Sequence, residues 1–216
     1  MATKEMFEIE VKSIQMQPPI LLADNTTKRQ SLIKEEQVKN LVSLEAFLRR
    51  AAYKNTTIKT DESFFDDSDM KSEYNLVIVY DKTSGTPLLS ARHYFDKALI
   101  SKFLKGDNDK EIELLYLGEK FNLDSYPDGN IFLADRLSGN ISSSIYRQYR
   151  NRVFSFYYSE IVNTNKNGFL LLMVRKEKHN KQLSKYLKLG FVLMGSTIHK
   201  GKEHSIILGD LKTYSI

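Results

Sequence analysis

The 216-residue sequence contains no cysteine and no tryptophan. The lack of cysteine excludes disulfide bonds and thiolate metal ligands. The only histidines are His93, His179, His199 and His204, and their spacing does not match a metal site. The sequence also lacks an apolar run long enough to span a membrane, and its N-terminus alternates polar and apolar residues instead of forming the apolar stretch of a signal peptide. We therefore expect a cytoplasmic protein with no membrane span and no metal ion.

The charge is unevenly distributed, although the total is only +5. Residues 1–135 carry 18 Lys or Arg against 23 Asp or Glu, a net charge of −5, whereas residues 136–216 carry 14 against 4, a net charge of +10. A basic last third favours a surface that binds a phosphorylated cofactor, an acidic carrier protein or nucleic acid. The alternative is that the lysines serve only to keep the chain soluble. The charge alone does not choose among these.

The first half of the sequence predicts strands and one helix. Residues 6–14 alternate as a strand does, and apolar residues at three- and four-residue steps predict an amphipathic helix over 31–51. Residues 55–73 are polar and acidic and predict a loop. The runs 75–81 and 87–95 are joined by KTSGT and predict an antiparallel hairpin.

The middle of the sequence predicts a short helix and two strands before a long helix. The helix is expected at 97–104, and the strands at 111–118 and 130–136. The long helix opens at the serines 142–144 and closes at Asn167-Gly168. Its expected buried face carries Ile145, Tyr149, Val153, Phe156 and Ile161.

The last part of the sequence predicts a buried strand, a helix and two further strands. Residues 168–174 are continuously apolar, as in a strand that is covered on both faces. A helix over 179–189 follows, with Gly190 as its left-handed C-cap. The segments FVLMG and SIILGDL finish the chain as strands.

This order of elements, with Tyr186-Leu187-Lys188-Leu189-Gly190-Phe191 at the last helix-to-strand junction, resembles the C-terminal half of the GNAT acyltransferase superfamily. Tyr186, Gly190 and Phe191 match the Tyr-x-x-x-Gly-Phe pattern of many members. The resemblance implies an α/β fold with a mixed, mostly antiparallel central sheet flanked by helices. It also implies one domain over 1–216, with the N-terminal strand, helix and acidic loop in 1–74 and the core in 75–216.

The resemblance implies an N-acyltransferase that moves an acyl group, acetyl in the leading version, from acyl-CoA to an amine by direct attack. This chemistry needs a neutral amine, donors for the oxyanion and an acid for the departing thiolate. Tyr186 matches the family's acid, and the alternative is a tyrosine that only packs on the sheet. Backbone groups near Ala134 and Leu137 would bind pantetheine where the strand 130–136 separates from the strand 168–174.

The glycine-rich phosphate loop of the family is not reproduced in this chain. The segment from Arg136 to Gly139 has the arginine and the first glycine, and the segment 149–155 has only the start of the pattern. Arginine side chains would then bind the phosphates in place of the backbone groups of a glycine loop. The competing interpretation is that these arginines form only a solvated helix face. The candidate cofactor-binding arginines are Arg136, Arg147, Arg150 and Arg152.

A second resemblance is to the acyl-homoserine lactone synthase branch of the superfamily. It rests on the acidic-aromatic segment 60–66, the hairpin that follows it and FNLDS at 121–125. That branch lacks the glycine loop, keeps an arginine after the strand, here Arg136, and often takes its acyl group from acyl carrier protein. An alternative function is therefore acyl transfer fed by an acidic carrier protein that docks on the basic face. Ser63 stands where the branch has an acid.

The amine needs a carboxylate that holds its ammonium form or removes a proton. Asp135 at the end of the strand 130–136 is the main candidate, and Asp61, Asp66 and His93 are others. The alternative for Asp135 is a simple charge pair with Arg136.

A third hypothesis is a GNAT-shaped binding protein without catalysis. The lysines at 178, 181, 185 and 188 fall on one helical face that could meet phosphates. No aromatic platform for bases accompanies these lysines, so we do not expect nucleic acid as a partner.

Overall fold

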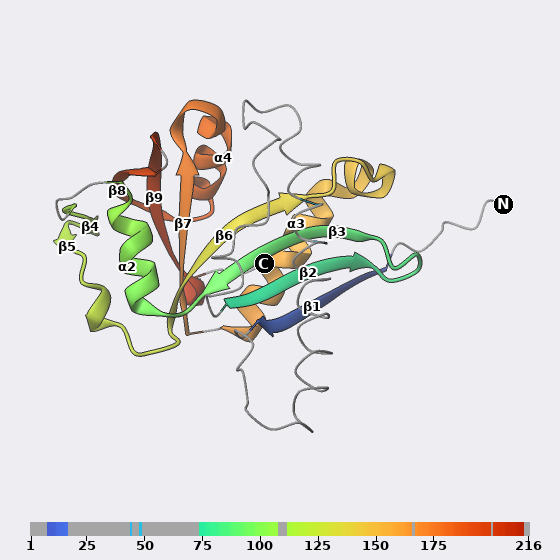
Figure 1. Ribbon diagram of the computed structural model, residues 1–216, viewed down its shortest axis with the longest axis horizontal. Helices are drawn as coiled ribbons and strands as arrows, with labels where there is room; N and C mark the ends of the chain where they lie inside the picture. The colour runs from blue at the N-terminus through green and yellow to red at the C-terminus, as the bar shows by residue number, and fades with distance from the viewer. Residues whose placement is uncertain are drawn as a thin grey trace, which may run out of the picture. The chain divides into compact units, whose positions relative to one another are not determined.

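The computed structural model describes residues 8–16, 44, 48, 74–107, 112–165, 167–199 and 201–213. Seven strands form one sheet in the order β1-β2-β3-β6-β7-β9-β8, and β4 pairs with β5 separately (Figure 1). The elements are β1 (Ile9–Met16), β2 (Tyr74–Asp81), β3 (Pro87–Tyr94), α2 (Lys97–Lys105), β4 (Leu115–Tyr116), β5 (Glu119–Lys120), η2 (Leu123–Ser125), β6 (Ile131–Gly139), α3 (Ser144–Thr164), β7 (Phe169–Arg175), α4 (Lys176–Lys188), β8 (Val192–His199), β9 (Lys202–Asp210) and η3 (Leu211–Thr213).

The chain divides into two compact units. Unit 1 comprises Met1–Arg92 and Arg136–Tyr157, and unit 2 comprises His93–Asp135 and Tyr158–Ile216. Each unit therefore joins segments that are distant in sequence. The expectation of one domain over 1–216 stays a prediction.

Unit 1 contains the β1–β2 pair and the hairpin that leads into β3. β1 and β2 are antiparallel, from Ile9↔Asp81 to Met16↔Tyr74. The hairpin turn is fixed by Asp81, whose amide donates to Thr86 O at 2.9 Å and whose carboxylate accepts from the amide of Ser84 at 3.1 Å. The predicted strand at 6–14 and the predicted hairpin are thus confirmed within the described residues.

The centre of unit 2 is β7. This strand pairs in parallel with β6 from Ile131↔Phe169 to Ala134↔Leu172. On its other side it pairs antiparallel with β9 along its whole length. Leu170 and Leu171 have no exposed surface, which confirms a strand covered on both faces.

The β8 edge of the sheet meets the end of α2. The amide of Asp107 donates to Ile198 O at 2.6 Å, and the Asp107 carboxylate accepts from the amide of Gly201 at 2.7 Å. Thr197 Oγ1 donates to Lys105 O at 3.1 Å. The end of α2 and the turn after it are therefore bound by two hydrogen bonds to β8 and by one to the turn between β8 and β9.

The strand predicted over 111–118 is wrong as one continuous strand. Within the described residues 112–118 the strand covers Leu115–Tyr116, which pairs with Glu119–Lys120 across a two-residue loop. Leu117 and Gly118 in that loop have φ of 52° and 89°, and positive φ at both positions is what a tight hairpin of this kind requires. The chain therefore reverses where the apolar pattern indicated continuation.

The predicted buried face of the long helix is also partly wrong. α3 begins after Ser143, whose Oγ accepts from the amide of Tyr146 at 3.3 Å. Tyr149 has non-helical angles, φ −111° and ψ 19°, so the helix is kinked there. Phe156 is 38% exposed, whereas the buried residues of α3 are Tyr146, Val153, Tyr157 and Ile161.

The predicted fold class is confirmed. The pair β6–β7 is parallel, whereas β1–β2, β4–β5, β7–β9 and β8–β9 are antiparallel. The chain order β6-α3-β7-α4-β8-β9 is the one expected. The helix predicted over 31–51 and the loop over 55–73 lie outside the described residues, except that Leu44 and Leu48 are helical. Within the described part of the chain, no helix has both the length and the apolarity needed to cross a lipid bilayer.

Candidate functional site

The string from Tyr186 to Phe191 forms a Schellman motif at the end of α4. The amide of Phe191 donates to Tyr186 O and the amide of Gly190 donates to Leu187 O, each at 3.1 Å. Gly190 has φ of 90°, which glycine adopts without strain. The rings of Tyr186 and Phe191 pack edge to face with centroids 5.3 Å apart. The spacing of this string therefore has a structural cause in helix capping.

Helix capping does not explain the hydroxyl of Tyr186, which has two polar partners. It lies 2.7 Å from the hydroxyl of Tyr158, and it accepts a hydrogen bond from Gln182 Nε2 at 3.1 Å. Gln182 and Tyr186 lie one turn apart on α4, whereas Tyr158 belongs to α3. Sequence reasoning found Tyr186 but missed both partners.

The environment of Tyr186 keeps its hydroxyl protonated at neutral pH. The residue is 5% exposed. Burial raises its pKa, while the hydrogen bonds with Tyr158 and Gln182 act in the opposite direction. The result is a neutral phenol whose oxygen is held in place by two neighbours, and such a group can donate a proton.

The predicted residues on β6 fall in both units. Ala134 and Asp135 belong to unit 2, where Ala134 forms the last pair of the parallel register and is 7% exposed. Arg136 and Leu137 belong to unit 1, where Leu137 is partly buried. The side chain of Arg136 lies outside the described residues.

Gly139 in unit 1 has a packing role. A Cβ atom at this position would lie 1.9 Å from the hydroxyl oxygen of Tyr146, on the first turn of α3. Burial raises the pKa of Tyr146 to about 12, and Arg150 acts in the opposite direction. The glycine of the Arg136-to-Gly139 segment is thus explained by the close approach of Tyr146.

The three arginines of α3 do not share one face. Arg147 Nη1 donates to Ile141 O at 3.3 Å, and Arg150 lies one turn further along the helix. Arg152 is two residues beyond Arg150, which corresponds to roughly 200° around a helix of 3.6 residues per turn. All three side chains are exposed. Arg150 and Arg152 therefore point to different sides of α3, and the kink at Tyr149 separates Arg147 from both.

His93 lies in the core of unit 2. It is 4% exposed, and its ring centroid is 5.0 Å from that of Phe132. Burial lowers its pKa to about 4, so the ring is neutral at pH 7. This deep position suits the structural alternative for His93 better than the role of a base.

The lysines of α4 are exposed where the structure describes them. Lys181, Lys185 and Lys188 lie at three- and four-residue steps and so share one face of the helix. The side chain of Lys178 lies outside the described residues. These three lysines form a basic stripe.

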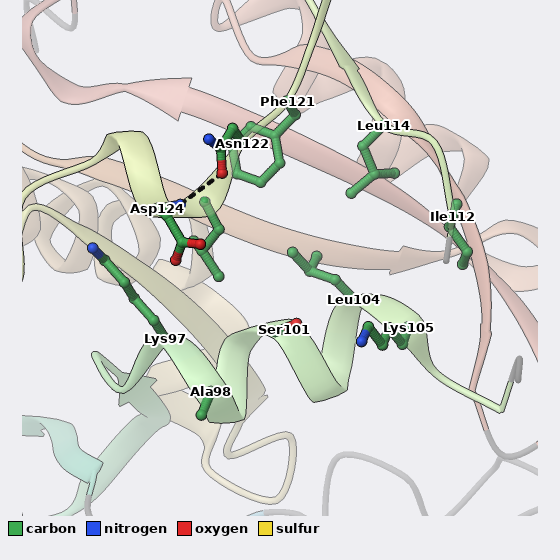
Figure 2. Close-up of a pocket in the computed structure, with 11 residues that line it drawn as sticks. Lys97, Ala98, Ser101, Leu104, Lys105, Ile112, Leu114, Phe121, Asn122 and Asp124 are labelled. Atoms are coloured by element: carbon green, nitrogen blue, oxygen red, sulfur yellow. Dashed lines mark hydrogen bonds between the residues drawn. The ribbon is translucent and has the colours of Figure 1, made fainter. Parts of the chain in front are cut away.

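Unit 2 also contains a hollow of about 420 Å³ between α2 and the segment that carries β4, β5 and η2. Leu104 and Leu114 point toward each other across it, and Ser101 faces it from α2 (Figure 2). At one end Lys97 forms an ion pair with Asp128 at 2.9 Å. The mixed lining suits a small amphipathic molecule. The lining residues are Lys97, Ala98, Ser101, Leu104, Lys105, Ile112, Leu114, Phe121, Asn122, Leu123 and Asp124, and none was predicted as a site residue.

No cluster of three or more His, Cys, Asp or Glu side chains that could hold a metal ion occurs within the described ranges. The expectation that the protein uses no metal therefore stays a prediction.

No family model and no curated protein matches the sequence. Solved structures are similar to the chain. A GNAT-family acetyltransferase from Streptococcus agalactiae has 10% identity over 95% of this chain and 97% of its own, with a TM-score of 0.45. The AHL synthase LasI has 10% identity over 95% and 91%, with a TM-score of 0.47. An acyl-CoA N-acyltransferase from Pseudomonas aeruginosa has 10% identity over 92% and 99%, with a TM-score of 0.43. Because these scores are below 0.5, the fold class rests on the strand order and registers given above.

Proposed function

We propose that this protein is an N-acyltransferase that moves an acyl group, acetyl in the first instance, from acyl-CoA to an amine. The observation that carries the proposal is the buried, protonated hydroxyl of Tyr186, held by Tyr158 and Gln182 at the end of α4. A phenol in this state is suited to give a proton to a departing thiolate.

The reaction begins with attack of the neutral amine on the thioester carbonyl. The tetrahedral intermediate collapses, the carbon–sulfur bond breaks, and the thiolate takes the proton of Tyr186. The nitrogen loses one proton to water, and water later returns a proton to the tyrosine oxygen. Asp135 is proposed to bind the ammonium form, which gives a proton to water and so becomes the neutral amine that attacks.

The remaining predicted residues bind the donor in this proposal. Backbone groups at Ala134 and Leu137 are assigned to pantetheine. Arg147 and Arg150 are assigned to its phosphates, because both are exposed on the first turns of α3, where the helix dipole also favours an anion. Arg136 is the alternative phosphate ligand.

Calorimetric titration with acetyl-CoA tests donor binding. We expect Arg150→Ala to weaken binding by about tenfold, the loss of one charge-assisted contact. Lys120→Ala removes an equal charge from an exposed position on β5 and is the matched control. If Arg136→Ala weakens binding and Arg150→Ala does not, the alternative ligand is the correct one.

Thiol release from acetyl-CoA tests the reaction. Because the chain has no cysteine, a thiol-reactive dye detects free CoA without a protein background. A panel of primary amines, amino acids and short peptides serves as acceptors. Tyr186→Phe should lower kcat about a hundredfold with little change in donor binding. Full activity of this variant would exclude Tyr186 as the acid.

A second candidate donor is acyl carrier protein. The observation that favours it is the basic stripe of Lys181, Lys185 and Lys188, which suits an acidic protein surface. Transfer from a carrier protein should then weaken steeply with salt and with substitution of these lysines by glutamine, whereas use of acyl-CoA should be much less sensitive to both. Equal salt dependence for both donors would argue against docking.

A further inference from the structure

The oxygen of Tyr186 takes part in a defined hydrogen-bond arrangement. A phenol has one hydrogen to donate and two lone pairs that accept. The Nε2–H of Gln182 occupies one lone pair at 3.1 Å. The hydroxyl of Tyr158 at 2.7 Å either donates to the second lone pair or accepts the phenol's own hydrogen. When Tyr158 donates, Tyr186 keeps its hydrogen for a third partner.

The two neighbours matter most after that hydrogen has left. A phenolate is costly to form at a position that is 5% exposed, because few water molecules reach it. The O–H of Tyr158 and the N–H of Gln182 would then both point at the negative oxygen. Hydrogen bonds to a charged group are about twice as strong as those between neutral groups.

We propose that Tyr158 and Gln182 are positioning residues that stabilise the phenolate of Tyr186 left behind when its proton passes to the departing thiolate. This inference rests on the proposed function. The O–H bond of Tyr186 breaks, its electron pair stays on the tyrosine oxygen, and the proton forms the S–H bond of CoA. The two hydrogen bonds strengthen in that step and need no other reactant.

Packing holds the ring of Tyr186 in the orientation that this role requires. Tyr158 contacts it edge to face with centroids 6.2 Å apart, and Phe191 contacts it edge to face at 5.3 Å. The Schellman motif fixes the backbone of Tyr186 and Phe191 relative to each other. Gln182 is placed one helical turn before Tyr186, on the same face of α4. The oxygen of Tyr186 therefore lies within hydrogen-bond distance of the Tyr158 hydroxyl and of Gln182 Nε2.

Ionisation of Tyr186 itself is the direct test. Protein labelled with ¹³Cζ-tyrosine is titrated by NMR, and the Tyr186 resonance is assigned by its loss in Tyr186→Phe. We expect Tyr158→Phe and Gln182→Leu each to move the pKa of Tyr186 upward, because each removes one donor to the phenolate. Gln182→Glu should move it further, since a carboxylate replaces the donor. Tyr149→Phe is the control, because the Tyr149 hydroxyl accepts from Gln148 on the same helix α3.

Kinetics of thiol release provide the second readout. Tyr158→Phe and Gln182→Leu should each lower kcat about tenfold, with KM for acetyl-CoA unchanged. The alkaline limb of kcat should move to higher pH together with the NMR titration. A packing role alone would lower stability without moving either pH profile, and thermal melts of the variants measure that separately.

The outcomes separate this inference from the proposed function. If Tyr186→Phe keeps full kcat, the general-acid assignment fails and this inference fails with it. If Tyr186→Phe loses activity but its titration is unchanged in the Tyr158 and Gln182 variants, only this inference is overturned. It is also overturned if Tyr158→Phe loses as much activity as Tyr186→Phe while the Tyr186 titration stays in place, because Tyr158 is then the acid.

Discussion

Acidification should destabilise this protein through His93. The residue is 4% exposed beside Phe132, and burial lowers its pKa from 6.5 to about 4. In the unfolded chain the ring takes up a proton as the pH falls through 6.5, whereas in the folded chain it resists protonation until about pH 4. The stabilising contribution is therefore complete above pH 6.5 and is lost between 6.5 and 4.

The size of the effect follows from the two pKa values. Each pKa unit of difference corresponds to about 1.4 kcal/mol, so the shift of the His93 pKa from 6.5 to about 4 corresponds to about 3 kcal/mol of folding stability. Between pH 7 and pH 5 the expected loss in the free energy of unfolding is about 2 kcal/mol. This is a large part of the free energy of unfolding of a typical domain, which is roughly 5–15 kcal/mol.

Urea denaturation at pH 7 and pH 5, followed by circular dichroism, measures the loss. Carboxylates also titrate in this range, so the quantity of interest is the difference between the wild type and His93→Gln. The variant should be less stable at pH 7 and should lose about 2 kcal/mol less on acidification. His204→Gln is the control, because His204 is partly exposed on β9. Equal acid loss in wild type and His93→Gln would refute a buried neutral ring.

Three other predictions concern packing and alkaline pH. Gly139→Ala should lower the free energy of unfolding by about 1–3 kcal/mol in urea, because a Cβ would lie 1.9 Å from the hydroxyl of Tyr146. Gly209→Ala should lower the melting temperature, since its Cβ would lie 2.7 Å from the ring of Phe191, and Phe191→Leu should restore part of the loss. Tyr146→Phe should reduce the loss of stability between pH 10 and pH 12: the tyrosine has a pKa of about 12 when folded and 10.0 when unfolded, so its contribution is present below pH 10 and lost above it. The last prediction is contradicted if the urea midpoints of Tyr146→Phe and of the wild type fall by the same amount between pH 9 and pH 11.

Local signals in the sequence predicted β7 and the end of α4 well. The apolar run that became β7 needs cover on both faces whatever surrounds it, and Gly190 marks a helix end through its own backbone preference. The kink at Tyr149 and the reversal at Leu117 were not predictable in the same way. Both residues adopt backbone angles that their side chains do not favour, so contacts elsewhere in the fold decide them.

The candidate site was predicted only in part for a similar reason. Tyr186 was found because it begins a recognisable string, and Gln182 had a signal that was overlooked, its position one turn earlier. Tyr158 lies 28 residues before Tyr186, and no periodicity links two helices separated by a strand. The three arginines matched a charge pattern, but helical geometry places Arg152 away from Arg150.

The turn after α2 also influences how molecules of this protein behave in a crowded solution. The last strand of an open sheet offers its backbone to any extended chain and is a common starting point for fibrous aggregation. Here the amide of Asp107 already occupies Ile198 O, and a side chain at Gly106 would meet that same carbonyl at 2.1 Å. The fold thus closes part of its own open edge, and a substitution at Gly106 would risk uncovering a surface that recruits other copies of the chain.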